Sequence, residues 1–132
     1  MMVLRSSGLK LRQTVDLNGQ WSFALDPHDE GMEAGWQTAS LDALIRVPGS
    51  WEEQGFGDTP STRPLGGWSK HHEYEGAAWY SRSIDIPADW NDRSVQLRLS
   101  GVRWRSQVWL DGVSAGSNES LSTPHVYDLT PL

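Results

Sequence analysis

The amino-acid sequence predicts an all-β protein folded as a β-sandwich. Apolar and polar residues alternate over residues 21–26 and again over 94–100, which is the pattern of a strand with one buried face. The Asp111-Gly112 pair is a strong hairpin signal, because a type I′ turn needs positive φ at both central residues. No stretch of useful length shows the 3.6-residue period of an amphipathic helix. The 132 residues have the length of one domain with one core.

The strands of the first half follow from local patterns. Trp21, Phe23 and Leu25 share one face of the first strand, and a turn at residues 16–19 precedes it. Small and polar residues over 27–35 indicate a loop that can include one helical turn. A short strand is expected over 44–47, where Pro48-Gly49 ends it.

The second half is expected to hold four more strand segments. One spans 79–86 and ends at Pro87, and the connection 88–92 follows it. The clearest strand is 94–100, in which Val95, Leu97 and Leu99 face inward. Residues 107–110 lead into the Asp111-Gly112 turn, and residues 126–129 form the last strand.

Charge and composition exclude several classes of partner and chemistry. The net charge of −6, without a basic cluster, argues against nucleic acid and against an anionic membrane surface. The chain has no cysteine, which excludes disulfides and cysteine-built zinc sites. No apolar run has membrane-spanning length, and the N-terminus lacks the apolar stretch of a secretory signal, so a cytoplasmic location is favoured.

Residues 49–76 stand apart because they contain six of the thirteen glycines and show no sustained alternation. Structureless connections of this length are usually functional or disordered. The segment also carries the groups that a sugar ring requires, an aromatic face and planar hydrogen-bonding side chains. The candidate ligand-binding residues here are Arg63, Trp68, His71, His72 and Tyr74.

Other chemistries find little support. Adjacent histidines on an extended chain point to opposite sides, so His71 and His72 do not predict a metal site, and no metal or cofactor is expected. Glu73 and Glu75 could share a face, but solvated loop carboxylates are the better interpretation than a glycosidase pair. No Gly-x-Ser-x-Gly elbow or phosphate-binding glycine loop is present. The eight tryptophans fit either large core residues or sugar-stacking surfaces.

Four short motifs in a fixed order resemble a known family. They are LNGQW at residues 17–21, VPGSW at 47–51, YEGAAWY at 74–80 and VWLDG at 108–112, with Ile86-Pro87 and Trp90 also in place. Together they resemble the N-terminal sugar-binding domain of glycoside hydrolase family 2, which includes β-galactosidases, β-glucuronidases and β-mannosidases. The resemblance implies a jelly-roll β-sandwich of the galactose-binding type, with residues 1–15 as an N-terminal extension and 16–132 as the domain.

The resemblance also implies where the chemistry lies. Family members continue into an immunoglobulin-like sandwich and a (β/α)₈ barrel that carries both catalytic glutamates, so no catalytic residue is expected within this chain. A loop of the first domain, which corresponds to residues 49–76 here, can reach the rim of the active site. The family domain has further strands beyond the position of Leu132, so the sandwich is expected to be incomplete at its C-terminal end.

One segment departs from the family pattern. Members commonly show a Gly-Gly-Tyr type loop followed by Pro-Phe, whereas this chain has ESLSTPH at residues 119–125. The resemblance therefore assigns no single substrate class. Asn118, which precedes the run, and His125, which ends it, are two further candidate ligand contacts.

Three functional hypotheses follow. The first is the sugar-binding and architectural N-terminal domain of a retaining exo-glycosidase, which hydrolyses O-glycosyl bonds in carbohydrate metabolism. Its partners would be a β-linked glycoside and the downstream domains of the same polypeptide. The second is a stand-alone carbohydrate-binding module, and the third is a purely structural β-domain whose tryptophans all lie in the core.

Overall fold

The computed structural model describes residues 12–57 and 74–132, and within them the protein is all-β. Among the described residues, a 3₁₀ turn, η1 (Ala88–Trp90), is the one helical element in the order of elements. No helix of the described residues is long and apolar enough to span a membrane. The strands are β1 (Gly19–Asp26), β2 (Ala43–Val47), β3 (Ala77–Ser81), β4 (Gln96–Leu99), β5 (Ser106–Leu110), β6 (Val113–Asn118) and β7 (His125–Asp128).

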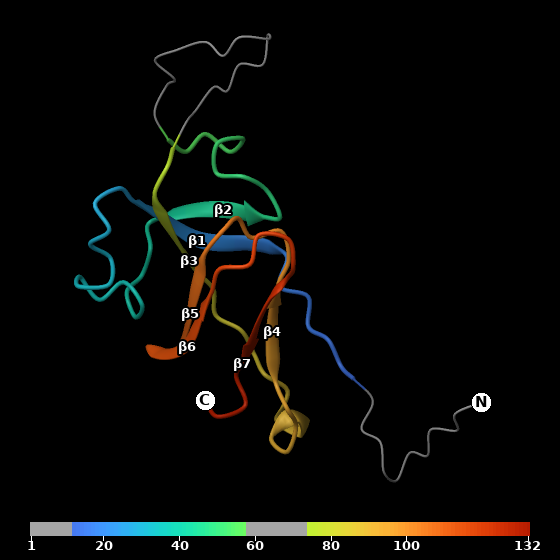
Figure 1. The fold of residues 1–132 in the computed structure, drawn as a ribbon. Helices are drawn as coiled ribbons and strands as arrows, with labels where there is room; N and C mark the ends of the chain where they lie inside the picture. Colours follow the sequence, from blue (N-terminus) through green and yellow to red (C-terminus); the bar gives the residue numbers. More distant parts are fainter. Residues whose placement is uncertain (1–11, 58–73) are drawn as a thin grey trace.

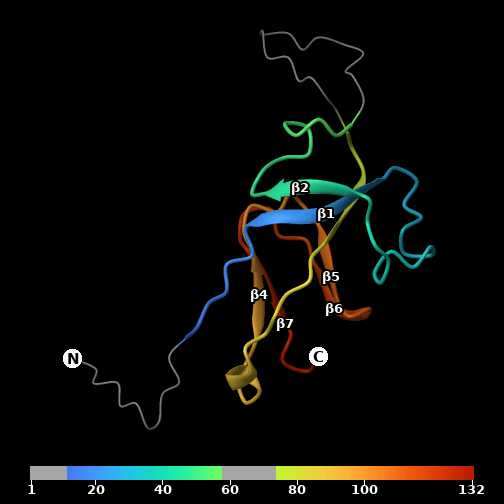
Figure 2. The ribbon, with the colours of Figure 1, turned by 180° about the vertical axis from the view of Figure 1, so that it is seen from behind.

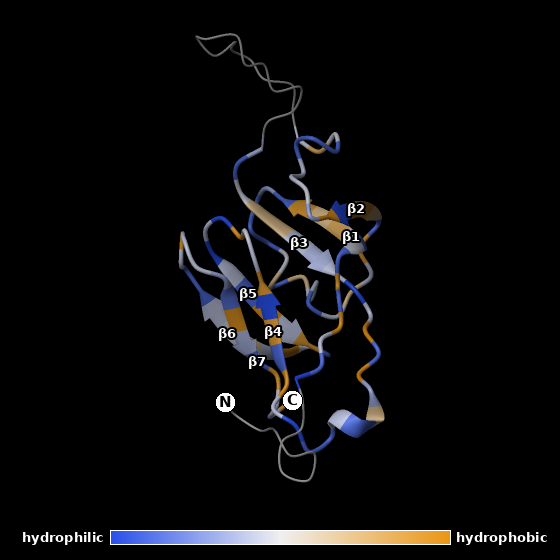
Figure 3. Cartoon of the chain, turned by 90° about the vertical axis from the view of Figure 1, so that its right-hand side faces the viewer, coloured by the Kyte–Doolittle hydropathy of each residue, from blue (hydrophilic) through white to orange (hydrophobic). Residues whose placement is uncertain are grey.

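The strands pair antiparallel in three groups. A three-stranded sheet has the order β2-β1-β3, while β4 pairs with β7 and β5 pairs with β6. Figures 1 and 2 show β1 and β2 crossing the other two pairs at a steep angle, as in a sandwich whose layers are not aligned. Hydrophilic and hydrophobic residues alternate along β4 in Figure 3, as the sequence pattern of this strand predicts.

Most predicted strands are confirmed, with one clear difference. The predicted strand over 79–86 begins two residues earlier and ends at Ser81, because only residues 77–81 find ladder partners on β1. The predicted helical turn in the first loop is present, since the Ala34 amide donates to the Glu30 carbonyl over 2.9 Å. The predicted hairpin turn has φ values of 49° at Asp111 and 81° at Gly112.

The apolar core gathers around Phe23 in the middle of β1. Phe23 is fully buried and Ile45 of β2 is 2% exposed. The Phe23 ring packs edge-on against Phe56 at 4.6 Å and against Tyr80 at 5.0 Å. The first contact brings residues that follow β2 onto β1, and the second brings in β3. On the other layer, Tyr127 and Leu129 are the buried members of the core.

A buried carboxylate closes the end of β1. Asp26 is 3% exposed, and its side chain accepts hydrogen bonds from the Glu30 amide at 2.9 Å, the Gly31 amide at 2.8 Å and the Trp79 indole at 3.0 Å. Burial alone would raise the pKa of Asp26, but these hydrogen bonds, with the nearby His28, outweigh it and hold the pKa below its ordinary value. The ionised carboxylate therefore binds the following loop to β3.

Three tryptophans pack together beside this carboxylate. The Trp79 ring stacks on Trp109 at 5.1 Å with an interplanar angle of 24°. Trp36, from the loop after β1, meets the Trp79 ring edge-on at 6.1 Å. These three tryptophans are therefore packing residues, whereas Trp104 is 62% exposed.

A methyl group at Gly31 should disturb this arrangement. A Cβ there would lie 2.6 Å from Trp79 Cε2 and 2.7 Å from the Asp26 carboxylate. We expect Gly31→Ala to lower the free energy of unfolding by about 2 to 3 kcal/mol in a urea titration. Gly35→Ala is the matched control, because its Cβ meets no atom within 4 Å and adds only left-handed backbone strain of about 1 kcal/mol. An equal or larger loss in Gly35→Ala would contradict the packing argument.

The pH dependence of stability should report on Asp26. A carboxylate with a lowered pKa in the folded state contributes stability that is complete above the unfolded value, about 3.9, and is lost as the pH falls through the folded value. We expect the urea midpoint to hold down to about pH 5 and to fall below about pH 4. Asp26→Asn should start from a lower midpoint and show a shallower acid fall.

The control for this prediction is Asp128→Asn. Hydrogen bonds from Thr130 lower the pKa of Asp128 as well, but this carboxylate is exposed and its contribution is screened by solvent. Its variant should keep the acid dependence of the natural protein. An acid fall that is unchanged in Asp26→Asn would show that other groups control it.

Candidate functional site

Residues 49–57 and 74–76 are the described parts of the glycine-rich segment, and we call them the stem. The stem follows β2 and leads directly into β3. Its two sides meet through the Trp51 and Tyr74 rings, which pack edge-on at 5.7 Å. Phe56 inserts against the buried Phe23 ring. Aromatic contacts therefore hold the two sides of the stem together and pack one of them on the core.

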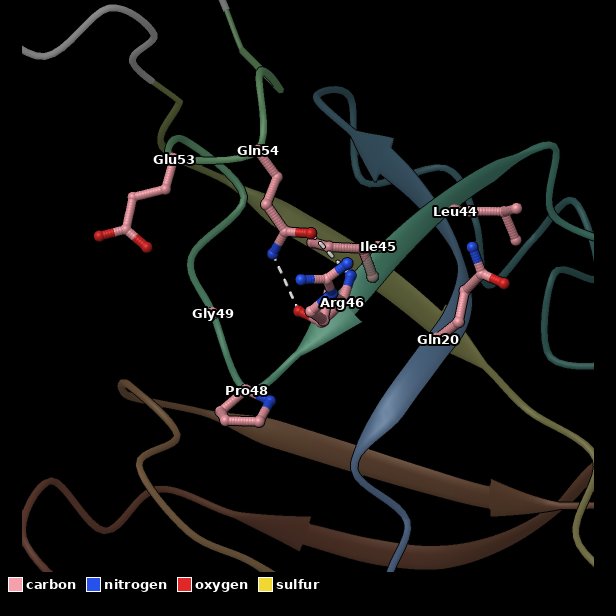
Figure 4. A pocket seen from close by; sticks show the side chains of 8 residues that line it. All are labelled: Gln20, Leu44, Ile45, Arg46, Pro48, Gly49, Glu53 and Gln54. Atoms are coloured by element: carbon pink, nitrogen blue, oxygen red, sulfur yellow. Dashed lines mark hydrogen bonds between the residues drawn. The ribbon is translucent and has the colours of Figure 1, made fainter.

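A glutamine side chain completes one side of the stem. Gln54 Oε1 accepts from the Arg46 amide at 2.7 Å, and Gln54 Nε2 donates to the Arg46 carbonyl at 2.9 Å and to the Ser50 carbonyl at 3.3 Å. The amide thus satisfies the outward-facing backbone groups of Arg46, as a neighbouring strand would. In Figure 4, Gln54 reaches toward Arg46 while Glu53 points away from it.

An open groove of about 630 Å³ lies beside this contact on the outer face of β1 and β2. Its walls carry planar hydrogen-bonding side chains but no aromatic ring, so it lacks the stacking surface that a sugar requires. The lining residues are Gln20, Leu44, Ile45, Arg46, Pro48, Gly49, Glu53 and Gln54.

Tyr74 is the described member of the candidates predicted on the long segment. Its hydroxyl donates to the Ala77 carbonyl at 2.5 Å, and its ring packs on Trp51. Burial raises the pKa of Tyr74 above its ordinary value, and the nearby charges of Asp26 and Asp29 act in the same direction. The hydroxyl is therefore protonated at neutral pH. Arg63, Trp68, His71 and His72 lie outside the described residues.

The other two candidates lie at the turn between β6 and β7, residues 118–124. Asn118 Oδ1 accepts the Ser120 amide at 3.0 Å, and the Ser120 carbonyl lies 2.7 Å from His125 Nε2. His125 is fully buried, and its Nδ1 lies 2.5 Å from Ser106 Oγ. Asn118 and His125 are thus both hydrogen-bonded to the backbone of Ser120. Within the described ranges, no hydrogen bond or ring contact joins Tyr74 to either residue.

Several of the contacts described above carry no local sequence signal. Ser106 Oγ lies 2.5 Å from Nδ1 of His125, a residue 19 positions away in the sequence. It also lies 2.6 Å from the hydroxyl of Tyr127, which is 21 positions away. Gln54 is recognisable only once the edge of β2 is known. For metal binding, residues 12–57 and 74–132 contain no group of three or more histidine, aspartate or glutamate side chains placed to hold an ion.

Comparison with known proteins identifies relatives. The family model described as "Glycosyl hydrolases family 2, sugar binding domain" matches residues 14–132. The chain is 29% identical to a β-galactosidase of Halalkalibacterium halodurans, covering 87% of this chain and 13% of the relative. It is also 29% identical to the β-glucuronidase of Canis lupus familiaris, covering 92% of this chain and 19% of the relative.

Solved structures agree with the sequence relatives. A β-glucuronidase from Ruminococcus gnavus in complex with D-glucuronic acid matches with a TM-score of 0.74 at 27% identity. The match covers 94% of this chain and 21% of that protein. The chain therefore spans about a fifth or less of the length of the proteins it matches.

The Gln54 contact gives a prediction for the stem. Gln54→Glu removes the N–H donor and turns a carboxylate toward the Arg46 and Ser50 carbonyls, so we expect a loss of about 1 kcal/mol in the free energy of unfolding. Glu53→Gln, the neighbouring control that changes charge in the opposite sense, should stay within about 0.5 kcal/mol. Equal effects of the two changes in urea titrations would exclude a specific role for Gln54.

Proposed function

This chain belongs to the sugar-binding domain of glycoside hydrolase family 2, and from that membership we propose that it is the N-terminal sugar-binding and architectural domain of a longer retaining exo-glycosidase. The observation that carries the proposal is the family match over residues 14–132, together with relatives that are β-galactosidases and β-glucuronidases. In this proposal the substrate is a β-linked glycoside, and the catalytic carboxylates belong to other domains of the same polypeptide.

The carboxylate that is buried at the end of β1 supports this division of roles. A retaining glycosidase needs a general acid whose pKa is raised and a second carboxyl group about 5 to 5.5 Å away. Asp26 has a lowered pKa and three N–H donors around it, so it is a structural anion and a poor proton donor. The domain then contributes position and binding to the reaction.

The proposed sugar contacts come from two parts of the sequence. Tyr74 and the candidates Arg63, Trp68, His71 and His72 belong to residues 49–76, and the other contacts belong to the turn 118–124 and the residue after it. Asn118 uses Oδ1 within the turn, which leaves its amide N–H groups for a sugar hydroxyl. The buried position of His125 supports a contribution through Ser120.

The test is enzymatic. The complete polypeptide that carries this chain should hydrolyse an aryl β-galactoside, β-glucuronide or β-mannoside. NMR of the first product should show that the configuration at the anomeric carbon is retained. The 132-residue chain should show no hydrolysis. Failure on every β-glycoside would overturn the proposal, and sugar binding by the chain in a protein without hydrolase activity would identify a stand-alone binding module instead.

Within an active enzyme, Asn118→Ala should raise KM by about fivefold to tenfold while kcat changes little, as expected for one lost hydrogen bond to the sugar. Asn91→Ala, at the exposed end of η1, is the control and should leave KM unchanged. An unchanged KM in Asn118→Ala would remove this residue from the proposed contacts.

A further inference from the structure

We infer that His125 is a positioning residue, which holds the turn 118–124, and with it Asn118, through a hydrogen bond from its Nε2–H to the Ser120 carbonyl. The inference rests on the proposed function, because it assigns His125 an indirect part in sugar binding. It also assigns the hydrogen-bonding roles of the ring, in which Nε2 donates to the Ser120 carbonyl and Nδ1 accepts from the Ser106 hydroxyl.

The partners of the ring determine these roles. His125 Nε2 lies 2.7 Å from the Ser120 carbonyl oxygen, which can only accept, so Nε2 carries the proton. In a neutral ring Nδ1 is then an acceptor, and the Ser106 hydroxyl at 2.5 Å donates to it. The single Tyr127 O–H is then shared between Ser106 Oγ at 2.6 Å and the Ser106 carbonyl at 2.9 Å.

Burial makes this arrangement hard to replace with water. His125 is fully buried and Tyr127 is 3% exposed, so a ring nitrogen that lost its partner would not be hydrated by solvent water. The partners of the ring are hydroxyl and carbonyl groups, namely the Ser106 hydroxyl, the Ser120 carbonyl and, beyond Ser106, the Tyr127 hydroxyl.

Ser120 transmits the position of the ring to the surface. All three of its polar groups are engaged, because its amide bonds to Asn118, its carbonyl to His125 and its hydroxyl to Thr123 at 2.5 Å. The next residue, Leu121, is 71% exposed, so the turn is anchored on its inner side. A change at the His125–Ser120 bond is therefore expected to move the Ser120 amide that holds the Asn118 side chain, while the Asn118 backbone stays paired with Ser106 in the β5–β6 ladder.

Two variants separate the two bonds of the ring. His125→Gln places an amide N–H near the position of Nε2 and keeps the bond to Ser120, whereas His125→Asn reaches only Ser106. In the complete enzyme, we expect His125→Asn to raise KM for the aryl β-glycoside by about fivefold to tenfold, as Asn118→Ala does, with kcat little changed. His125→Gln should stay within about twofold of the natural KM.

Ser106→Ala is the control for stability, because it breaks the other bond of the ring and leaves His125 in place. It should lower Tm and leave KM within about twofold. If the role of His125 were purely structural, Ser106→Ala and His125→Asn would change KM alike. If KM rises in all three variants in proportion to the loss of Tm, or if His125→Asn and His125→Gln behave alike, the inference is wrong.

The tautomer provides a test that does not depend on activity or on the His125 variants. In ¹⁵N-histidine-labelled protein at neutral pH, one ring should show a protonated Nε2 and a bare Nδ1, and Ser106→Ala should shift that Nδ1 signal. A ring with protonated Nδ1 would overturn the inference even in an active enzyme. An inactive enzyme with the expected tautomer and shift would instead remove the proposed function and leave the assigned proton positions of the His125 ring standing.

Discussion

The arrangement of the sheets depends on the need to satisfy one buried carboxylate. Asp26 ends β1 with almost no exposure to water, where an unpaired charge would be very costly. Its donors come from the loop that follows, at Glu30 and Gly31, and from the Trp79 indole on β3. That last bond orients the indole, whose ring then stacks on Trp109 of β5. One satisfied anion therefore links the loop, the three-stranded sheet and the second layer.

The same rule explains how the candidate loops are held. Each one is fixed by a polar side chain that bonds to backbone, Gln54 at Arg46 and Ser50, Tyr74 at Ala77, and His125 at Ser120. Backbone partners do not depend on which side chains the loop carries, so the exposed residues of such a loop can vary while its path is kept. This is the arrangement expected of a binding surface supported by a rigid scaffold.

Sequence patterns were sufficient for the strands and for the family, and insufficient for the polar interior. Alternation identified β1 and β4, and the Asp111-Gly112 pair identified the β5–β6 turn, because these signals are local. Alternation also placed Asp26 opposite to the inward-facing Phe23 and Leu25, yet the loop after β1 folds over it and buries it. The Ser106–His125 pair depends on strand pairing at long range, so His125 was predicted only as a ligand contact.

The position of His125 is in turn a consequence of strand register. Along β7 and the residue after it, His125, Tyr127 and Leu129 are buried while Val126 and Asp128 are exposed. The pairs Leu99↔His125 and Leu97↔Tyr127 align this inner face with the inward leucines of β4. A slip by one residue would turn the imidazole to solvent and bring Val126 inward. The apolar pattern of β4 thus determines, through the register of β7, where the turn at Asn118 is held.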